Sequence, residues 1–211
     1  MSRVLGVVLA GGRATRMGGG DKGLLHLGER TLLDHVLERL APQVEAIALN
    51  ANGDPTRFDA FRLPVLPDSI SGHPGPLAGV LAGLDWAASH GATQIVTVAA
   101  DTPFFPRDLV ARLEEASAGM AHPLALAATP GTERKPGTER KRDRHPTFGL
   151  WPVALADDLR RALQEGVRKV VAWTDAHDGR VALFTSGDDP FFNVNTPEDL
   201  ARAQRVADGV T

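Results

Sequence analysis

The stretch VLGVVLAGGRATRMGGGDK, from Val4 to Lys22, decides what fold the rest of the chain builds. It opens with an apolar run, Val4–Ala10, that is rich in Val and Leu and ends at glycine, as a buried central strand does. A glycine-rich segment follows and carries the cations Arg16 and Lys22. Glycine has no side chain, so backbone N–H groups after the strand can approach a ligand closely. The stretch therefore predicts a strand followed by a binding loop.

The charges of this loop indicate what it binds. Arginine contacts phosphate oxygens as a fork and lysine as a point charge, and ligands of open α/β sheets bind beyond the carboxyl ends of the strands. The pattern GxxxxGK[ST] is absent, because Asp21 precedes Lys22 and Gly23 follows it, and GxGxxG is absent as well. We predict a nucleoside triphosphate site of another type. Taken alone, the loop also fits a glycine-rich connection with chance basic residues.

Composition limits the class of protein. The chain has 211 residues, 43% of them hydrophobic, which is enough for a sizeable core in one domain, residues 1–211. A formal charge of −3 argues against a dedicated nucleic-acid binder. The absence of cysteine excludes disulfides, thiolate metal sites and cysteine nucleophiles. The sequence has neither an apolar run of about 18 residues nor a signal peptide, so we expect a soluble, cytoplasmic protein that binds no membrane.

The first half of the chain alternates apolar runs with helical periodicity. Thr31 with Asp34 has the pattern of a helix N-cap. The order is βαβαβ followed by a further helix and strand, which predicts a single doubly wound, Rossmann-like α/β domain with a mostly parallel sheet. The expected strands are Val4–Ala10, 44–49, 63–66 and 94–100, and the expected helices are 32–41, 54–60 and 76–90.

The second half contains an unusual repeat. The hexapeptide PGTERK occurs twice in succession over residues 130–141, and we expect residues 130–144 to form a flexible, charged loop. This loop is either a solvated connection or a basic arm that attracts an anionic substrate. Around it we expect a helix over 106–118, a strand over 123–128, an antiparallel strand over 145–151, helices over 153–165 and 167–176, a strand over 181–185 and a last helix after Thr196.

Several polar residues follow predicted strands. Asp101 ends a central strand just before Pro103, and Mg²⁺ prefers one or two carboxylates together with substrate phosphates and water. Asp101 is therefore a candidate metal ligand, with a turn cap as the alternative. Asn193 and Asn195 precede the last helix, where their amides either reach a phosphate or cap the turn at Thr196.

Two further features bear on the site. Pro76 lies in the segment PGPLAG and suits the first turn of a helix, whose free N–H groups and positive dipole end favour an anion. The seven histidines show neither HxH nor HExxH spacing, and no GxSxG segment supports hydrolase chemistry. Only His145, which follows the basic loop, is retained as a candidate, with a surface or packing role as the alternative.

The motifs taken together resemble a known family. LAGG…RMG…DK, NAN, PGPLAG, DTP, HPTF and NVNTPEDL occur in order over nearly the whole chain, and they resemble the nucleotidyltransferases, in particular the molybdenum cofactor guanylyltransferase family. The resemblance implies Mg²⁺-dependent transfer of GMP from GTP to the terminal phosphate of molybdopterin, with release of pyrophosphate. Cytidylyltransferase relatives show LAAG and lack PGPLAG, so a CTP-dependent or sugar-phosphate enzyme is the runner-up, followed by an inactive nucleotide-binding protein.

The residues and the resemblance together assign roles. GTP and molybdopterin would be the substrates, with transient contacts to cofactor-biosynthesis proteins and acceptor apoenzymes, and we expect a monomer that binds no nucleic acid. The catalytic residues would be Arg16, Lys22 and Asp101, with Asp101 also holding the metal. The GTP-binding residues would be Leu9, Ala10, Gly11, Gly12, Lys22, Asn50, Asp68, Pro76, Leu77 and Asp101, and the cofactor-binding residues His145, Asn193 and Asn195.

Overall fold

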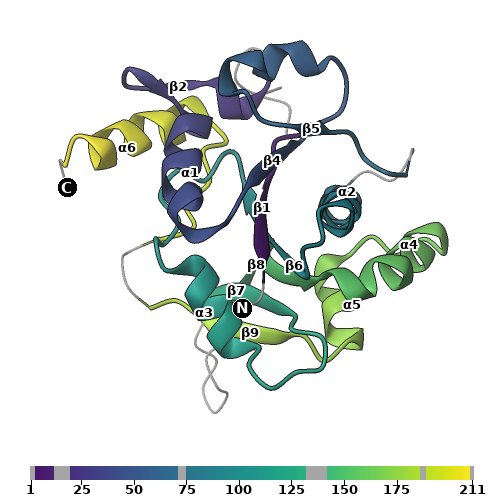
Figure 1. Cartoon of the computed structure of the whole chain (residues 1–211). Coiled ribbons are helices and arrows are strands. Elements are labelled where there is room, and N and C mark those ends of the chain that lie inside the picture. The colour runs from purple at the N-terminus through teal and green to yellow at the C-terminus, as the bar shows by residue number, and fades with distance from the viewer. Residues whose placement is uncertain (1–2, 12–19, 71–74, 132–141, 186–188, 210–211) are drawn as a thin grey trace.

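The chain is described by a computed structural model that covers residues 3–11, 20–70, 75–131, 142–185 and 189–209. A seven-stranded sheet in the order β5-β4-β1-β6-β8-β7-β9 forms its centre (Figure 1). β8 is antiparallel to both of its neighbours and the other pairs are parallel, so the predicted mostly parallel sheet with one antiparallel strand is confirmed. The strands are β1 (Val4–Leu9), β4 (Ile47–Asn50), β5 (Val65–Leu66), β6 (Gln94–Ala99), β7 (Ala125–Pro130), β8 (Arg142–Pro152) and β9 (Arg180–Leu183).

Helices cover both faces of this sheet, as the doubly wound prediction requires (Figure 1). One face packs against α1 (Leu32–Leu40) and α3 (Leu109–Ala116), and the other against α2 (Pro76–Ser89), α4 (Ala156–Gln164) and α5 (Val170–Ala176). A third, smaller core lies under α6 (Pro197–Ala207) and the hairpin of β2 (His26–Leu27) and β3 (Arg30–Thr31). Short 3₁₀ helices are η2 (Lys22–Leu24), η3 (Ala41–Gln43), η4 (Pro55–Phe61) and η5 (Val153–Leu155).

Strand β1 is an interior strand of the sheet, since it pairs with β4 on one side and β6 on the other. Its central residues Val7 and Val8 are fully buried, as expected for a parallel strand covered on both faces. In register, Leu9 lies opposite Asn50 of β4 and opposite Ala99 of β6. The three strands therefore end at the same edge of the sheet, and the residues that follow them meet there.

Local chemistry explains where two of the helices begin. Thr31 caps α1 with a capping box, in which its side chain accepts from the Asp34 N–H at 3.1 Å and Asp34 Oδ2 accepts from the Thr31 N–H at 2.8 Å. Thr196 and Asp199 form the same arrangement at α6, as the sequence predicts. Helix α2 begins at Pro76 and is apolar on nearly all sides, because it lies in the core between the sheet and α4.

The structure differs from the expectations in two places and gives the type of one expected helix. The short helix expected over 54–60 is the 3₁₀ helix η4, Pro55–Phe61, and the β2–β3 hairpin is absent from the elements that the sequence predicts. The loop expected over 130–144 is wrong at both ends, because Pro130 pairs with Arg142 and Ala128 pairs with Arg144. Arg142 and Asp143 are exposed, so their charges do not oppose the backbone pairing that extends the two strands. The middle of the repeat, residues 132–141, lies outside the described residues.

No helix within the described ranges is long and apolar enough to cross a membrane.

Candidate active site

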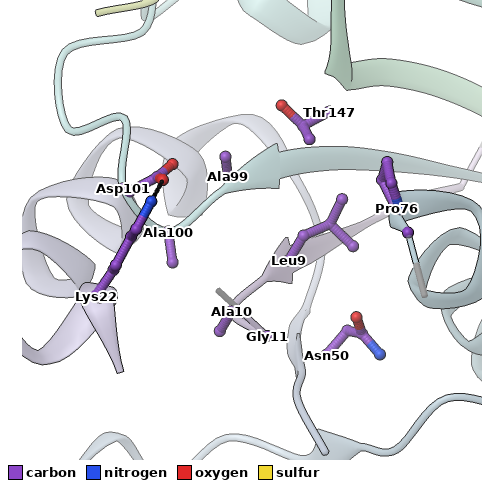
Figure 2. Close-up of a pocket in the computed structure, with 12 residues that line it drawn as sticks. Leu9, Ala10, Gly11, Lys22, Asn50, Pro76, Ala99, Ala100, Asp101 and Thr147 are labelled. Carbon is purple, nitrogen blue, oxygen red and sulfur yellow. Dashed lines mark hydrogen bonds and ion pairs between the residues drawn. The ribbon is translucent and has the colours of Figure 1, made fainter. Parts of the chain in front are cut away.

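A pocket of about 320 Å³ opens at the carboxyl edge of the central strands (Figure 2). Lys22 and Asp101 stand at one side of it, and Asn50 and Pro76 at the other. Because these side chains come from segments far apart in the sequence, the parallel sheet is what brings them together. The lining residues are Leu9, Ala10, Gly11, Lys22, Gly23, Asn50, Gly75, Pro76, Ala99, Ala100, Asp101 and Thr147.

Lys22 is the cation of the pocket. Its ammonium group lies 3.4 Å from Asp101 Oδ2 and donates a hydrogen bond to Asn195 Oδ1. About one fifth of each charged side chain is exposed, 20% for Lys22 and 21% for Asp101, so both are accessible to a ligand. A cation held beside an open pocket by two oxygen atoms can exchange one of them for a phosphate oxygen.

The position of Lys22 depends on close packing of η2 against the end of β6. A Cβ atom on Gly23 would lie 3.0 Å from the Cβ of Ala100, so a side chain there would strain the close contact of η2 with the end of β6. On the other side, Asp21 forms a 2.6 Å ion pair with Arg57 of η4. The glycine and the ion pair together hold Lys22 at the pocket.

The opposite wall is a network of two asparagines and an aspartate. Asn50 is 6% exposed, and its Nδ2 donates to Leu66 O at 3.1 Å and to Asp68 Oδ1 at 3.0 Å. Asn52 donates to Asp68 Oδ2 at 2.8 Å and accepts from the Asp68 N–H at 2.9 Å. Because Nδ2 of Asn50 is committed to these two acceptors, its Oδ1 is the amide atom left as an acceptor at the pocket wall.

Helix α2 comes close to this wall. A Cβ atom on Gly79 would lie 2.1 Å from Asn50 Oδ1, so the helix can reach Asn50 only because residue 79 is glycine. Pro76 at the start of the helix lines the pocket, and Gly75 before it has a φ of 139°, a backbone conformation that favours glycine. The helix N-terminus therefore borders the pocket, where its free N–H groups favour a negative charge.

A second group of residues lies on the far side of Asp101. The Val194 N–H donates to Asp101 O at 2.8 Å, and the Thr102 hydroxyl donates to Asn193 Oδ1. These bonds hold the segment of Asn193 and Asn195 against the end of β6.

His145 lies at the same edge of the sheet. Its ring stacks on Phe191 with centroids 4.3 Å apart, and its Nε2 lies 3.0 Å from Thr129 Oγ1. Burial lowers the pKa of His145 below the ordinary value of 6.5, and the charges of Asp189 and Asp143 oppose this shift only in part. The lowered pKa favours the neutral form of the imidazole, which packs on an aromatic ring, and any ligand contact it makes stays a prediction.

The structure places most of the predicted site residues together. Leu9, Ala10, Gly11, Lys22, Asn50, Pro76 and Asp101 all line the pocket. Asp68 is one hydrogen bond behind Asn50. Leu77, in the first turn of α2, is buried in the core and is not part of the lining. Gly12 and Arg16 lie outside the described residues, so their predicted roles stay predictions.

Other lining residues are not singled out by the sequence. Gly23, Gly75, Ala99, Ala100 and Thr147 all border the pocket. Thr147 belongs to the quoted segment HPTF, and Gly75 to PGPLAG, so the motifs contained the signal. Ala99 and Ala100 shape the pocket with their backbone and small side chains. A prediction based on reactive side chains does not identify such residues.

The donor chemistry of the pocket bears on the predicted metal. Among the described residues there is no group of three or more His, Asp or Glu placed to hold a metal ion. A single carboxylate in the lining of this pocket fits Mg²⁺, because this ion takes few protein ligands and completes its shell with phosphates and water. Asp101 is the residue that would hold it.

Solved structures of other proteins share the fold of this chain. The structure of molybdopterin-guanine dinucleotide biosynthesis protein A from Archaeoglobus fulgidus has a TM-score of 0.67, with 22% identity over 97% of this chain and 99% of that one. The structure of CMP:2-keto-3-deoxy-manno-octonic acid synthetase in complex with CTP has a TM-score of 0.72, with 16% identity over all of both chains. At these identities the likeness shows the shared fold.

The sequence comparisons then give the family. Residues 6–180 match the family described as the MobA-like NTP transferase domain. A molybdenum cofactor guanylyltransferase of Bradyrhizobium sp. (strain ORS 278) is 53% identical over 97% of this chain and 93% of its own length. One of Mesorhizobium japonicum is 47% identical over 99% and 98%. The chain belongs to the MobA-like NTP transferase family, and it is an enzyme.

Proposed function

We propose that this enzyme transfers GMP from GTP to the terminal phosphate of molybdopterin or its molybdenum form. An oxygen of that phosphate attacks the α-phosphorus of GTP, the bond from the α-phosphorus to the bridging oxygen breaks, and pyrophosphate leaves. The product is a guanine dinucleotide form of the cofactor. The attacking phosphate is already ionised at neutral pH, so the reaction needs no general base.

The observation that carries the proposal is the position of Lys22 between Asp101 and Asn195 at the pocket edge. Nucleotidyl transfer depends mostly on positioning and on neutralising phosphate charge. A lysine between the residue predicted to bind metal and a residue predicted to bind the cofactor is placed to contact the phosphates at the point of transfer. The relatives named as guanylyltransferases, at about half identity over nearly full length, support the choice of reaction.

Each wall of the pocket then has a role. Lys22 binds the triphosphate, and the backbone after β1 together with the start of α2 contacts its phosphates. Asn50, held by Asp68, offers a fixed acceptor to N–H groups of the guanine base. Mg²⁺ held by Asp101 would neutralise phosphate charge when bound.

A nucleotide panel tests the proposal. The purified protein is incubated with molybdopterin, Mg²⁺ and each of GTP, CTP, ATP and UTP, and pyrophosphate release and the dinucleotide product are both measured. Turnover with GTP alone is the expected result. Turnover with CTP would favour the cytidylyl reaction, and tight nucleotide binding without any turnover would mean that the protein binds nucleotides without transferring them.

A further inference from the structure

Thr102 follows Asp101 directly, and its side chain is fully buried although it carries a polar hydroxyl. The hydroxyl donates a hydrogen bond to Asn193 Oδ1, while Asp101 Oδ1 is further away at 3.4 Å. A threonine hydroxyl has one proton to donate, so the shorter contact takes it. The amide oxygen of Asn193 is thereby held against the protein.

The two asparagines beside Asp101 are both held by their amide oxygens. Asn195 Oδ1 accepts from Lys22, as Asn193 Oδ1 accepts from Thr102. Within the part of the chain that the structure describes, neither side-chain NH₂ group has an acceptor. Asn193 is exposed and Asn195 is half-buried, so both NH₂ groups can meet a ligand. With Lys22 they form a set of hydrogen-bond donors, which is the chemistry that recognises a phosphate anion.

We propose that Thr102 is a positioning residue that fixes the amide of Asn193 so that its NH₂ group binds the phosphate of the acceptor substrate. This inference rests on the proposed function, because it names the acceptor as a phosphomonoester. Rotation about the last side-chain bond of asparagine is loosely restricted. Without the hydroxyl, Asn193 can turn its oxygen toward the phosphate, where like partial charges repel.

The test compares Thr102→Val, which keeps the shape and removes the donor, with Thr102→Ser, which keeps the donor. We expect Thr102→Val to raise the KM for molybdopterin roughly tenfold, as for the loss of a hydrogen bond to a charged group, with the KM for GTP unchanged. Thr102→Ser should restore the wild-type KM. In an Asn193→Ala background, Thr102→Val should have no further effect, because Thr102 acts through that amide.

Thr97→Val is the matched control. Thr97 lies on β6, is also fully buried, and its hydroxyl accepts from Trp151 Nε1 at 2.8 Å, away from the pocket. This variant carries the same substitution at a buried threonine five residues earlier, and it should lower the melting temperature without changing the KM for molybdopterin. An equal rise in KM for the two valine variants, or a serine variant as impaired as Thr102→Val, would overturn the inference.

A spectroscopic measurement separates this inference from the proposed function. A wild-type enzyme that gives no turnover with GTP and molybdopterin refutes the proposed function. Whether or not the enzyme turns over these substrates, the side-chain NH₂ signals of Asn193 in ¹⁵N spectra should shift in Thr102→Val and stay in place in Thr97→Val. Unmoved Asn193 signals in Thr102→Val would rule out the positioning role by themselves.

Discussion

Lys22 and Asp101 are 79 residues apart in the sequence and form one ion pair at the pocket. The distance of 3.4 Å makes this a loose ion pair, and because only about one fifth of each side chain is exposed, the cost of desolvating the two charges offsets most of their attraction. The pair is therefore poorly explained as a stabilising contact. In the function proposed above, the two charges would have other partners, a phosphate for the lysine and a metal ion for the carboxylate.

Replacing Lys22 by alanine tests the first partner. We expect Lys22→Ala to lower kcat/KM for GTP at least tenfold, about 1.4 kcal/mol, because a phosphate counter-charge is lost. Steady-state pyrophosphate release measures this. Lys169→Ala is the control, since Lys169 is exposed just before α5 and is not among the residues that line the pocket. Wild-type kinetics in Lys22→Ala would remove Lys22 from the site.

Replacing Asp101 tests the second partner. If Asp101 holds Mg²⁺, Asp101→Ala should abolish Mg²⁺-dependent turnover and leave the melting temperature nearly unchanged, because the ion pair contributes little. If Asp101 only caps its turn, the variant should lose roughly 1 kcal/mol of stability and keep its activity. Thermal unfolding by circular dichroism, run beside activity at several Mg²⁺ concentrations, distinguishes the two outcomes.

At the scale of elements, strand β8 carries the least regular feature of the sheet. Its register with β7 shifts between two neighbouring pairs, because Leu126 lies opposite Gly149 while the next residue, Ala127, lies opposite His145. The intervening residues of β8 include Pro146, which has no N–H to donate and is tolerated at such an irregularity. As a result, Thr147 borders the pocket while His145 stacks on Phe191.

The packing of His145 predicts how stability depends on pH. Its pKa is lowered in the folded state, so between that value and 6.5 the unfolded chain binds more protons than the folded one. The free energy of unfolding therefore rises with pH across this window. The contribution of His145 to stability is lost as the pH falls through the same window. We expect His145→Phe, which keeps an aromatic ring on Phe191, to reduce the loss of stability on acidification.

Urea unfolding at about pH 5.5 and pH 7.5, on either side of the ordinary histidine pKa, measures the effect. The comparison is the difference in unfolding free energy between the two pH values, in wild type and variant. His122→Gln serves as the control because His122 is exposed. The same pH difference in His145→Phe as in wild type would show that His145 titrates without affecting folding.

The sequence predicts the elements that local interactions form and misses those that depend on contacts distant in the sequence. β1 and β6 are buried apolar runs and α1 has a capping box, so these elements are readable locally. The hairpin of β2 and β3 has two residues in each strand, too few for a periodic pattern, and it shares its small core with α6, which is distant in the sequence. The extension of β8 depends on its pairing with β7 and is invisible in a charged sequence.

The site residues divide in the same way, into those that a local pattern predicts and those that depend on contacts between distant segments. Residues that directly follow β1 and β6, such as Gly11 and Asp101, are predictable because the sheet order places them at one edge. The contact of Lys22 with Asn195 spans 173 residues, and no local pattern encodes it. In the sequence, Thr102 looks like an ordinary turn residue. Its partner Asn193 becomes apparent only when the fold places the segment before α6 against the end of β6.

At the scale of the whole molecule, charge is unevenly distributed. The chain has a net charge of −3, while residues 130–144 contain six cations and three anions, a local charge of +3. Arg144 is already paired with Asp175, which reduces the local excess. The repeat joins Pro130, at the end of β7, to Arg142 of β8. Because β7 runs parallel to β1 and β6, this connection leaves the sheet at the edge where the pocket lies.

The duplicated hexapeptide then predicts an electrostatic effect on substrate capture. Its cations would attract the anionic cofactor at long range, and salt at about 0.1 M screens such attraction beyond roughly 10 Å. Deleting residues 136–141 removes Arg140, Lys141 and Glu139, a net change of −1, and leaves a five-residue connection between Pro130 and Arg142. Connections of this length join hairpins readily. We expect kcat/KM for the cofactor to fall at low salt, with little change at high salt and with GTP binding unaffected.

A second variant separates the charge of the repeat from its length. Arg140→Gln with Lys141→Gln keeps the length of the connection and removes two positive charges. If steering by charge is the cause, this variant should lose at least as much kcat/KM at low salt as the deletion, because its change in charge is larger. The measurement is kcat/KM for molybdopterin over a series of salt concentrations at fixed GTP. Activity equal to wild type in both variants at every salt concentration would leave the repeat as a solvated connection between β7 and β8.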